Sequence, residues 1–139
     1  MSIGSVAHVC IKTRDLKRTD DFYCGALEMK KLFNFTRQGQ VIGCYIQAPN
    51  NTFIEVFLAG EAESIPDTQR ALHHFCLETD SIKALRQRLV GHGYAPKEII
   101  MGADHALQFW VQDPNGLKIE FQQYTERSSQ VTGHDVEVP

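Results

Sequence analysis

The sequence has little of what would direct it to a membrane, to nucleic acid or out of the cell. Its apolar runs have the length of strands, and none approaches the ~20 residues that a membrane-spanning helix needs. A net charge of −3 gives no bulk positive field that would attract nucleic acid or anionic lipid. Residues 1–5 lack the basic and apolar regions of a signal peptide. We therefore expect a cytoplasmic protein that binds a small molecule and neither membrane nor nucleic acid.

The cysteines lack the spacing of a redox or zinc motif. The four are Cys10, Cys24, Cys44 and Cys76, and no pair of them has the CxxC spacing. A chain of 139 residues can bury a core large enough to fold without disulfide bonds. The sequence predicts reduced thiols and a single domain over residues 1–139.

What the sequence does contain is a repeat. Residues 7–13, AHVCIKT, resemble residues 73–79, HHFCLET, and further matches follow at a spacing of 66 and later 65 positions. The matched pairs include His8 and His74, Cys10 and Cys76, Gly25 and Gly91, Pro49 and Pro114, and Glu55 and Glu120. Because only two copies of a ~65-residue unit are present, the pattern indicates a duplicated module and not a solenoid.

Each copy has the pattern of a βαβββ unit. Apolar or alternating runs predict strands, and amphipathic runs with a capping residue predict helices. The first module, about 5–59, has a helix that follows Asp15 and strands at 5–12, 31–37, 41–47 and 52–58. The second module, about 72–124, has a cap-started helix at about 81–91 and strands at 72–79, 97–101, 105–112 and 117–124. Residues 60–71 are predicted to form a linker, and 125–139 a polar tail without periodicity. The fold class is therefore α+β, with two tandem βαβββ modules.

Alternation along each strand sorts its side chains onto two faces. Glu55 lies on the face opposite apolar Ile54, and His8, His74 and Glu120 also lie opposite the apolar side chains of their strands. A helix can cover the apolar face of each sheet. The polar face is then free to line a cavity.

Two imidazoles and two carboxylates suit a divalent transition metal. We predict that His8, Glu55, His74 and Glu120 bind one ion, for which Ni, Co, Mn, Fe and Zn are all suitable. A lone histidine in a strand is more often structural, and the recurrence of both residue types at one spacing favours ligation. His73 competes with His74, but alternation would put it on the helix-packed face.

With these residues in two modules, the sequence resembles the vicinal oxygen chelate superfamily, also called glyoxalase/bleomycin resistance/dioxygenase, over residues 5–124. The motifs that carry the resemblance are His8 with Asp15-Leu16 and Phe22-Tyr23 after it, and the segment DPNGLKIE that ends at Glu120. The resemblance implies paired βαβββ units that form a curved mixed sheet around a metal-containing cavity.

Within that superfamily, four ligands of the type His/Glu/His/Glu are similar to those of glyoxalase I, the lactoylglutathione lyase. The resemblance implies a lyase or isomerase acting on the hemithioacetal of methylglyoxal and glutathione, whose enediolate the metal stabilises as a Lewis acid. A metal-bound glutamate would transfer the proton, with Glu120 as first choice and Glu55 as second. Two positions depart from the bacterial pattern: Lys12 replaces an arginine that binds glutathione, and Ala59 replaces an asparagine.

Two other functions fit the same residues. An Fe(II)-dependent dioxygenase of the extradiol type would use His8, His74 and Glu120 alone. A bleomycin-resistance-like protein would bind a ligand without catalysis. Each alternative makes its own prediction: the dioxygenase consumes oxygen and tolerates Glu55→Gln, and the binding protein holds no tightly bound metal.

Three further residues are predicted to contact the substrate. Cys10 and Cys76 follow the histidines by two positions and so share their faces, and Lys12 lies on the same face as Cys10. Ligation of a soft metal by the two thiolates is the less favoured interpretation. We also expect a homodimer, with each site formed either within one chain or across two.

Overall fold

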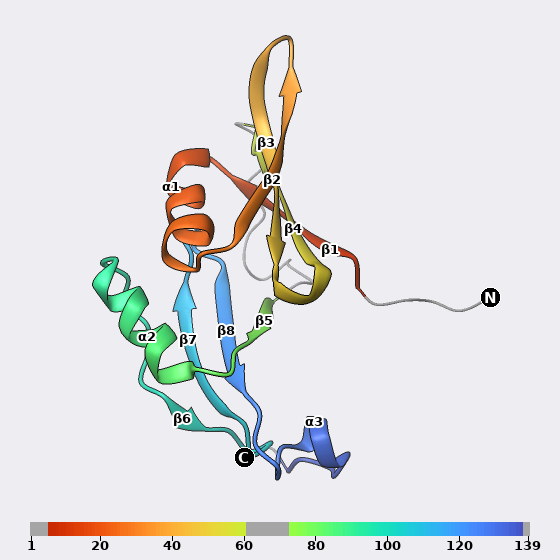
Figure 1. Cartoon of the computed structure of the whole chain (residues 1–139), viewed down its shortest axis with the longest axis vertical. Helices are drawn as coiled ribbons and strands as arrows, with labels where there is room; N and C mark the ends of the chain where they lie inside the picture. The colour runs from red at the N-terminus through yellow and green to blue at the C-terminus, as the bar shows by residue number, and fades with distance from the viewer. Residues whose placement is uncertain (1–5, 61–72, 138–139) are drawn as a thin grey trace, which may run out of the picture. The chain divides into compact units, whose positions relative to one another are not determined.

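The computed structural model describes residues 6–60 and 73–137. The chain divides into two compact units, residues 1–69 and 70–139, and each contains one four-stranded sheet (Figure 1). The repeated element order confirms the predicted α+β fold of two tandem βαβββ modules. Of the predicted linker, residues 60–71, only Gly60 lies within the described residues. No helix in the described ranges is long and apolar enough to cross a membrane.

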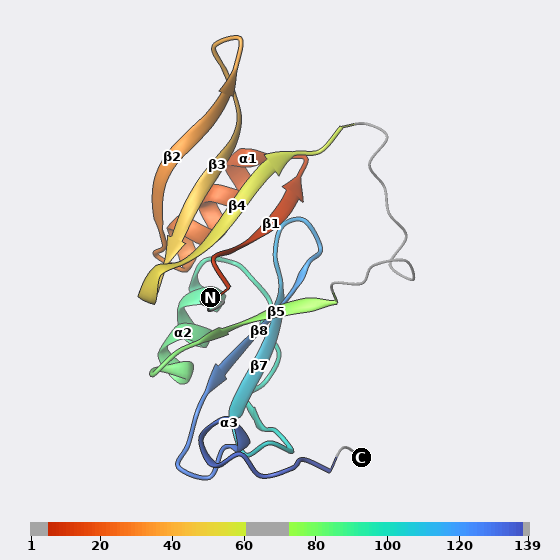
Figure 2. The same cartoon turned by 90° about the vertical axis from the view of Figure 1, so that its right-hand side faces the viewer.

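The first unit is a mixed sheet with a helix on one face. Its strands are β1 (His8–Thr13), β2 (Lys30–Arg37), β3 (Gln40–Ala48) and β4 (Thr52–Leu58), arranged in the order β1-β4-β3-β2. β1 is parallel to β4, and the other neighbours are antiparallel. α1 (Leu16–Asp20) continues into a π-helical segment, η1 (Asp21–Ala26), and lies behind this sheet in Figure 2. The 3-10 turn η2 (Pro49–Asn51) connects β3 to β4.

The core of the first unit lies between this helix and the sheet. The fully buried side chains include Phe22, Tyr23 and Ala26 from η1 and Ile46, Ile54 and Val56 from the strands. Burying an apolar side chain of such size contributes about 1.5–3 kcal/mol. A slip of one residue would lose this burial, so the register that leaves Glu55 on the opposite face is strongly determined. Asp15 caps α1 as predicted, because its carboxylate accepts a hydrogen bond from the Arg18 amide at 3.0 Å.

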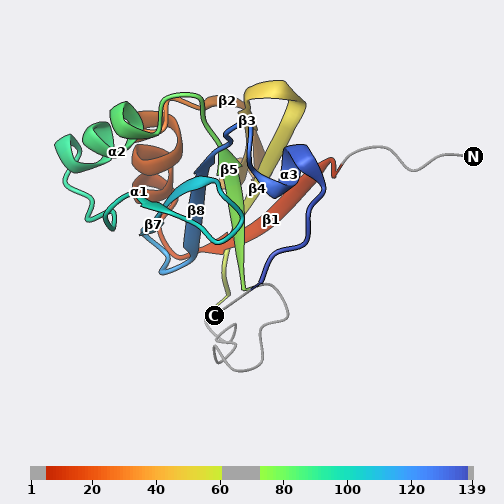
Figure 3. The same cartoon turned by 90° about the horizontal axis from the view of Figure 1, so that it is seen from below.

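The second unit repeats this arrangement. Its elements are β5 (His74–Glu78), α2 (Ile82–Gly91), β6 (Ile100–Met101), β7 (Leu107–Gln112) and β8 (Lys118–Gln123), and the sheet order is β5-β8-β7-β6. Seen from below in Figure 3, α2 lies to one side of β7 and β8. The core holds Leu89 from α2 with Phe109, Ile119 and Phe121 from the strands.

Three features of the second unit differ from expectation. β6 has two residues where five were predicted, at 97–101. The α2 terminus lacks a side-chain cap from Ser81, and the Ile82 amide donates instead to Gln123 Oε1 at 3.0 Å. The tail is not without structure: Ser129–Thr132 form a short helix, α3. The cap of α2 comes from a residue 41 positions away along the chain, which a local pattern does not show.

The turn between β7 and β8 has the structure that its sequence predicts. Asp113 accepts hydrogen bonds from the amides of Asn115 at 2.8 Å and Leu117 at 2.9 Å, and Gly116 adopts a φ of 79°. This turn sets the register of β8, and therefore the position of Glu120, relative to β7.

Candidate functional site

In the first unit, β1 and β4 bring His8 and Glu55 together. Their parallel pairing puts Cys10 opposite Glu55, and His8 lies two residues earlier on the same face. His8 Nε2 is 3.8 Å from Glu55 Oε2. The pair lies on the face that η1 does not cover.

In the second unit, β5 and β8 place His74 and Glu120 in the same relation. Cys76 is opposite Glu120, as Cys10 is opposite Glu55. His74 Nε2 is 3.4 Å from Glu120 Oε2. Two parallel strand pairs in one register therefore present the same His–Glu pair twice.

The spacing within each pair is suitable for binding a metal. Two ligands that each lie 2.0–2.2 Å from one ion are separated by about 3.0–3.5 Å, so the observed separations need little adjustment. Nitrogen and oxygen donors of these types suit the divalent metals from Mn to Zn. Among residues 6–60 and 73–137, no group of three or more His, Cys, Asp or Glu side chains is arranged to bind a metal. The structure thus brings the four predicted ligands together two by two.

Each histidine also has a polar contact at its other ring nitrogen. Tyr45 Oη is 3.4 Å from His8 Nδ1, and His73 Nδ1 is 2.8 Å from His74 Nδ1. Trp110 takes the position across from Glu120 that Tyr45 takes across from Glu55, and its ring packs edge-on against His74 at 4.6 Å. Such contacts fix the tautomer and orientation of a metal-binding imidazole.

The position of His73 corrects a prediction. Alternation put it on the helix-packed face, but His73 precedes β5 and its side chain is exposed. Alternation applies only within a strand, and the strand begins one residue later. Sequence reasoning also missed Tyr45 as the partner of His8. The repeat pairs Tyr45 with Trp110, and this match was a signal that both residues lie beside the equivalent histidines.

Aromatic side chains form a cluster on this face of the first sheet. The cluster consists of Phe33, Phe35, Tyr45, Phe53 and Phe57, with three stacked pairs at centroid distances of 4.6–5.2 Å. Gly43 allows β3 to approach β4 closely, because a Cβ there would collide with the Val56 carbonyl oxygen and would lie 2.9 Å from the Phe57 ring. The face next to His8 and Glu55 is therefore aromatic.

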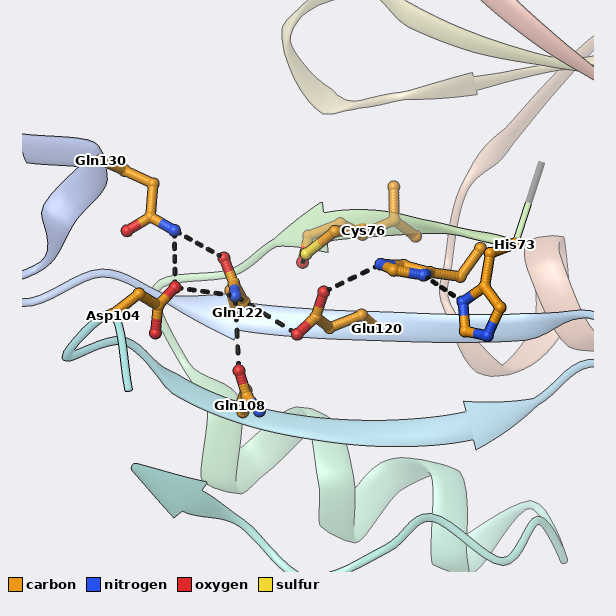
Figure 4. Close-up of polar contacts among 9 residues, drawn as sticks. His73, Cys76, Asp104, Gln108, Glu120, Gln122 and Gln130 are labelled. Atoms are coloured by element: carbon orange, nitrogen blue, oxygen red, sulfur yellow. Dashed lines mark hydrogen bonds and ion pairs between the residues drawn. The ribbon is translucent and has the colours of Figure 1, made fainter. Parts of the chain in front are cut away.

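The matching face of the second sheet is polar. Gln122 Nε2 donates to Glu120 Oε1 at 3.3 Å and to Asp104 Oδ2 at 3.2 Å, and Gln130 from α3 donates to Asp104 Oδ2 at 2.7 Å (Figure 4). Gln122 and Glu120 are both buried. The two pairs thus have the same geometry and different surroundings.

The predicted substrate-binding residues lie beside the two pairs. Cys10 and Cys76 are exposed on the same faces as the histidines. Desolvation, and then the neighbouring Glu120 carboxylate, raises the pKa of the Cys76 thiol to about 12. Desolvation and Glu55 also raise the pKa of Cys10. Without a metal, both thiols are therefore protonated at neutral pH. Lys12 Nζ lies 5.9 Å from the centre of the Phe57 ring, at the edge of the aromatic cluster.

These features define an α+β protein of duplicated βαβββ modules with one His–Glu pair on each sheet. The model of the Glyoxalase/Bleomycin resistance protein/Dioxygenase superfamily matches residues 7–109, so the chain belongs to that superfamily, as the resemblance predicted. No curated protein sequence matches the chain.

Several solved structures have the same fold. A glyoxylase/bleomycin resistance protein/dioxygenase domain from Frankia sp. EAN1pec is 19% identical with a TM-score of 0.78, and the match covers 96% of this chain and 100% of that one. An antibiotic-binding protein from Streptomyces sp. CB03234 is 20% identical with a TM-score of 0.74, over 90% and 99% of the two chains. A lactoylglutathione lyase from Agrobacterium tumefaciens is 13% identical with a TM-score of 0.65, over 88% and 96%. At these identities the similarity shows the fold alone.

Proposed function

We propose that this protein is a metal-dependent lyase or isomerase of the glyoxalase I type, acting on a substrate with two neighbouring oxygen atoms. The observation that supports the proposal is the His–Glu pair that recurs in one strand register, with Nε2–Oε2 distances of 3.8 and 3.4 Å. In this proposal His8, Glu55, His74 and Glu120 together bind one Ni, Co, Mn, Fe or Zn ion.

The contacts at the histidines are consistent with ligation through Nε2. A ligating imidazole must be neutral with its proton on the other nitrogen. Tyr45 Oη and His73 Nδ1 can each accept a hydrogen bond from that Nδ1–H group. A bound metal would supply Lewis acidity that stabilises the enediolate of the substrate. The proton then moves through a glutamate: it leaves C1 for a carboxylate oxygen and returns to C2.

The aromatic cluster supports a second candidate function, which is binding or oxidation of a flat ligand. Five rings beside His8 and Glu55 provide a surface on which a flat ligand can stack. Glutathione has no ring that could stack there. An extradiol-type dioxygenase with His8, His74 and Glu120, or a ligand-binding protein like the similar antibiotic-binding protein, would use this surface. Cys10, Cys76 and Lys12 would contact the bound molecule in either case.

Elemental analysis of the purified protein, followed by assays after loading with each metal, tests these functions. The lyase proposal predicts bound divalent metal and conversion of methylglyoxal with glutathione, lowered at least 100-fold by Glu55→Gln. Oxygen consumption with catechols that survives Glu55→Gln would establish the dioxygenase instead. Protein that binds no metal in equilibrium dialysis would leave only the binding function.

We also propose that the protein is a cytoplasmic homodimer. Equilibrium sedimentation tests the assembly directly. A monomer that turns over substrate would contradict a site shared between chains.

A further inference from the structure

The turn between β7 and β8 contains two residues, Asn115 and Gly116, that can react with each other. A backbone nitrogen that follows an asparagine can attack the carbonyl carbon of the asparagine side chain and form a five-membered succinimide ring. Glycine leaves this approach open, because it has no side chain and its backbone has the widest conformational freedom. The other asparagines, Asn34, Asn50 and Asn51, all precede larger residues.

In the folded turn, the nitrogen that would attack is already hydrogen-bonded. The Gly116 amide donates to the Asp113 carbonyl oxygen at 3.0 Å, which closes the turn. The attack requires this nitrogen to lose its proton, and a hydrogen bond donated by the neutral amide opposes that loss. The fold therefore restrains the nucleophile.

The Asp113 carboxylate restrains the other reacting group. Asn115 Nδ2 donates to Asp113 Oδ2 at 3.2 Å, and the Asn115 backbone amide donates to Oδ1 at 2.8 Å. The Leu117 amide also donates to Oδ1, at 2.9 Å. Asp113 is only 4% exposed, so these hydrogen bonds are shielded from water. Both the side chain and the backbone of Asn115 are thus tied to one carboxylate, which limits the rotation that the attack requires.

The repeat supplies an internal comparison. Residues 48–51, APNN, match residues 113–116, DPNG, at the spacing of 65. In the first unit an alanine replaces the aspartate, and an asparagine replaces the glycine. Asn50 therefore has neither the carboxylate that restrains Asn115 nor the glycine that makes it reactive.

Conversion of Asn115 would disturb the turn. The product is a carboxylate, which cannot donate the hydrogen bond that Nδ2 donates and which repels the neighbouring Asp113 carboxylate. In the isoaspartate form the main chain also passes through the side-chain methylene, so the turn gains one backbone atom. Because the turn sets the register of β8, whose first residue Lys118 pairs with Gln112, both changes weaken the pairing next to it.

We propose that Asn115 is a site of spontaneous deamidation, and that Asp113 keeps the reaction slow in the folded protein. In the step, a bond forms between the Gly116 nitrogen and Asn115 Cγ, the bond from Cγ to Nδ2 breaks, and ammonia leaves with the proton of the Gly116 amide. Water then opens the ring and leaves aspartate or isoaspartate at this position. The inference does not depend on the proposed metal site.

The experiment incubates the full-length protein at mildly alkaline pH and follows the mass of the digested peptide that contains Asn115. We expect Asp113→Ala to speed its modification about tenfold or more, because three hydrogen bonds to the carboxylate are lost. Asp113→Asn keeps one acceptor oxygen and should have a smaller effect. Its new asparagine precedes Pro114, whose nitrogen has no proton to lose, and so does not react in this way. Asp135→Ala, which removes an exposed carboxylate near the C-terminus, is the matched control and should keep the wild-type rate.

Unfolded protein in urea separates the reactivity of the sequence from the restraint by the fold. There Asn115 should react faster than in the folded wild type, and faster than Asn50 in the same digest. An Asn115 that reacts no faster than Asn50 in urea would overturn the site. Equal rates in the folded wild type and both Asp113 variants would show that this carboxylate does not restrain the reaction. If Asp113→Ala fails to fold by circular dichroism, Asp113→Asn decides the outcome.

The consequence for the turn is measured on a variant that carries the aspartate product. Asn115→Asp should lower the melting temperature by about 2–4 °C, because a donor is lost and a like charge is gained beside Asp113. Asn50→Asp places the same charge at the matching, exposed position of the first unit and should leave the melting temperature unchanged. Equal melting temperatures of the two variants would contradict the disturbance of the turn.

Discussion

Each candidate histidine has one ring nitrogen next to a carboxylate and the other next to a polar group. The polar groups differ between the two histidines. The hydroxyl of Tyr45 on β3 contacts His8, and the ring of His73, the residue before His74, contacts His74. Where the first unit has Tyr45, the second has Trp110, whose indole can donate but not accept. His73 therefore supplies the acceptor that Trp110 lacks.

Removing these acceptors should weaken metal binding without unfolding the protein. We expect His73→Ala and Tyr45→Phe each to raise the dissociation constant for Co(II) about tenfold, because the imidazole loses the partner that fixes its tautomer. Chelator competition measures this, and exposed His92→Ala serves as the control. Equal affinities in all three variants would show that His73 and Tyr45 do not orient the ligands.

The sequence predicts which face of a sheet each site residue lies on, but it does not predict which side chains from other strands and loops contact it. Alternation and the repeat correctly assigned His8, Glu55, His74 and Glu120 to the faces opposite the helices, because those faces follow from burial alone. The repeat could not reveal Gln122 as a partner of Glu120. That contact depends on the rotamers of Gln122 and Glu120, which strand alternation does not determine.

At the scale of elements, the bounds of β2, β3, β4 and β8 agree with the prediction to within one residue at each end, whereas those of β6 do not. β4 was predicted with the observed bounds, because it is a continuous apolar run broken only by Glu55. β6 is shorter than predicted because it is an edge strand with one neighbour, and its two residues are both exposed. α3 was missed because a helix of four residues has too short a pattern to detect.

The packing of α3 depends on Asp104 and should therefore depend on pH. Burial opposes ionisation of this carboxyl, but hydrogen bonds from Gln130, the Ala106 amide and Gln122 outweigh it and lower its pKa. A pKa lowered by folding stabilises the protein above the ordinary value of 3.8, and the contribution disappears as pH falls through the folded-state pKa.

Asp104→Asn measures that contribution. We expect it to lower the free energy of unfolding by about 0.5–1 kcal/mol at pH 7, a modest value because the carboxyl is only partly buried. The difference from the wild type should shrink as the pH falls below 3.8. Urea unfolding at several pH values provides the measurement. A difference that is constant with pH would mean that the charge of Asp104 is not involved.

At the scale of the whole molecule, the duplication gives each unit half of the proposed ligand set. A complete set therefore requires one first unit and one second unit, which can come from one chain or from two chains of a homodimer. The two arrangements predict different amounts of bound metal when two variants, each lacking one ligand, are mixed. His8→Ala removes a ligand from the first unit, and His74→Ala removes one from the second.

If the sites are shared across a homodimer, mixing and reassociating these two inactive variants should restore about a quarter of the wild-type metal sites. Half of the dimers would be mixed, and each of those would have one site with both histidines intact. We expect this recovery, measured as Co(II) bound per chain after brief denaturation and refolding of the mixture. Each variant treated alone is the control and should recover nothing. No recovery in the mixture, together with full binding by the wild type after the same treatment, would place both halves of each site within one chain.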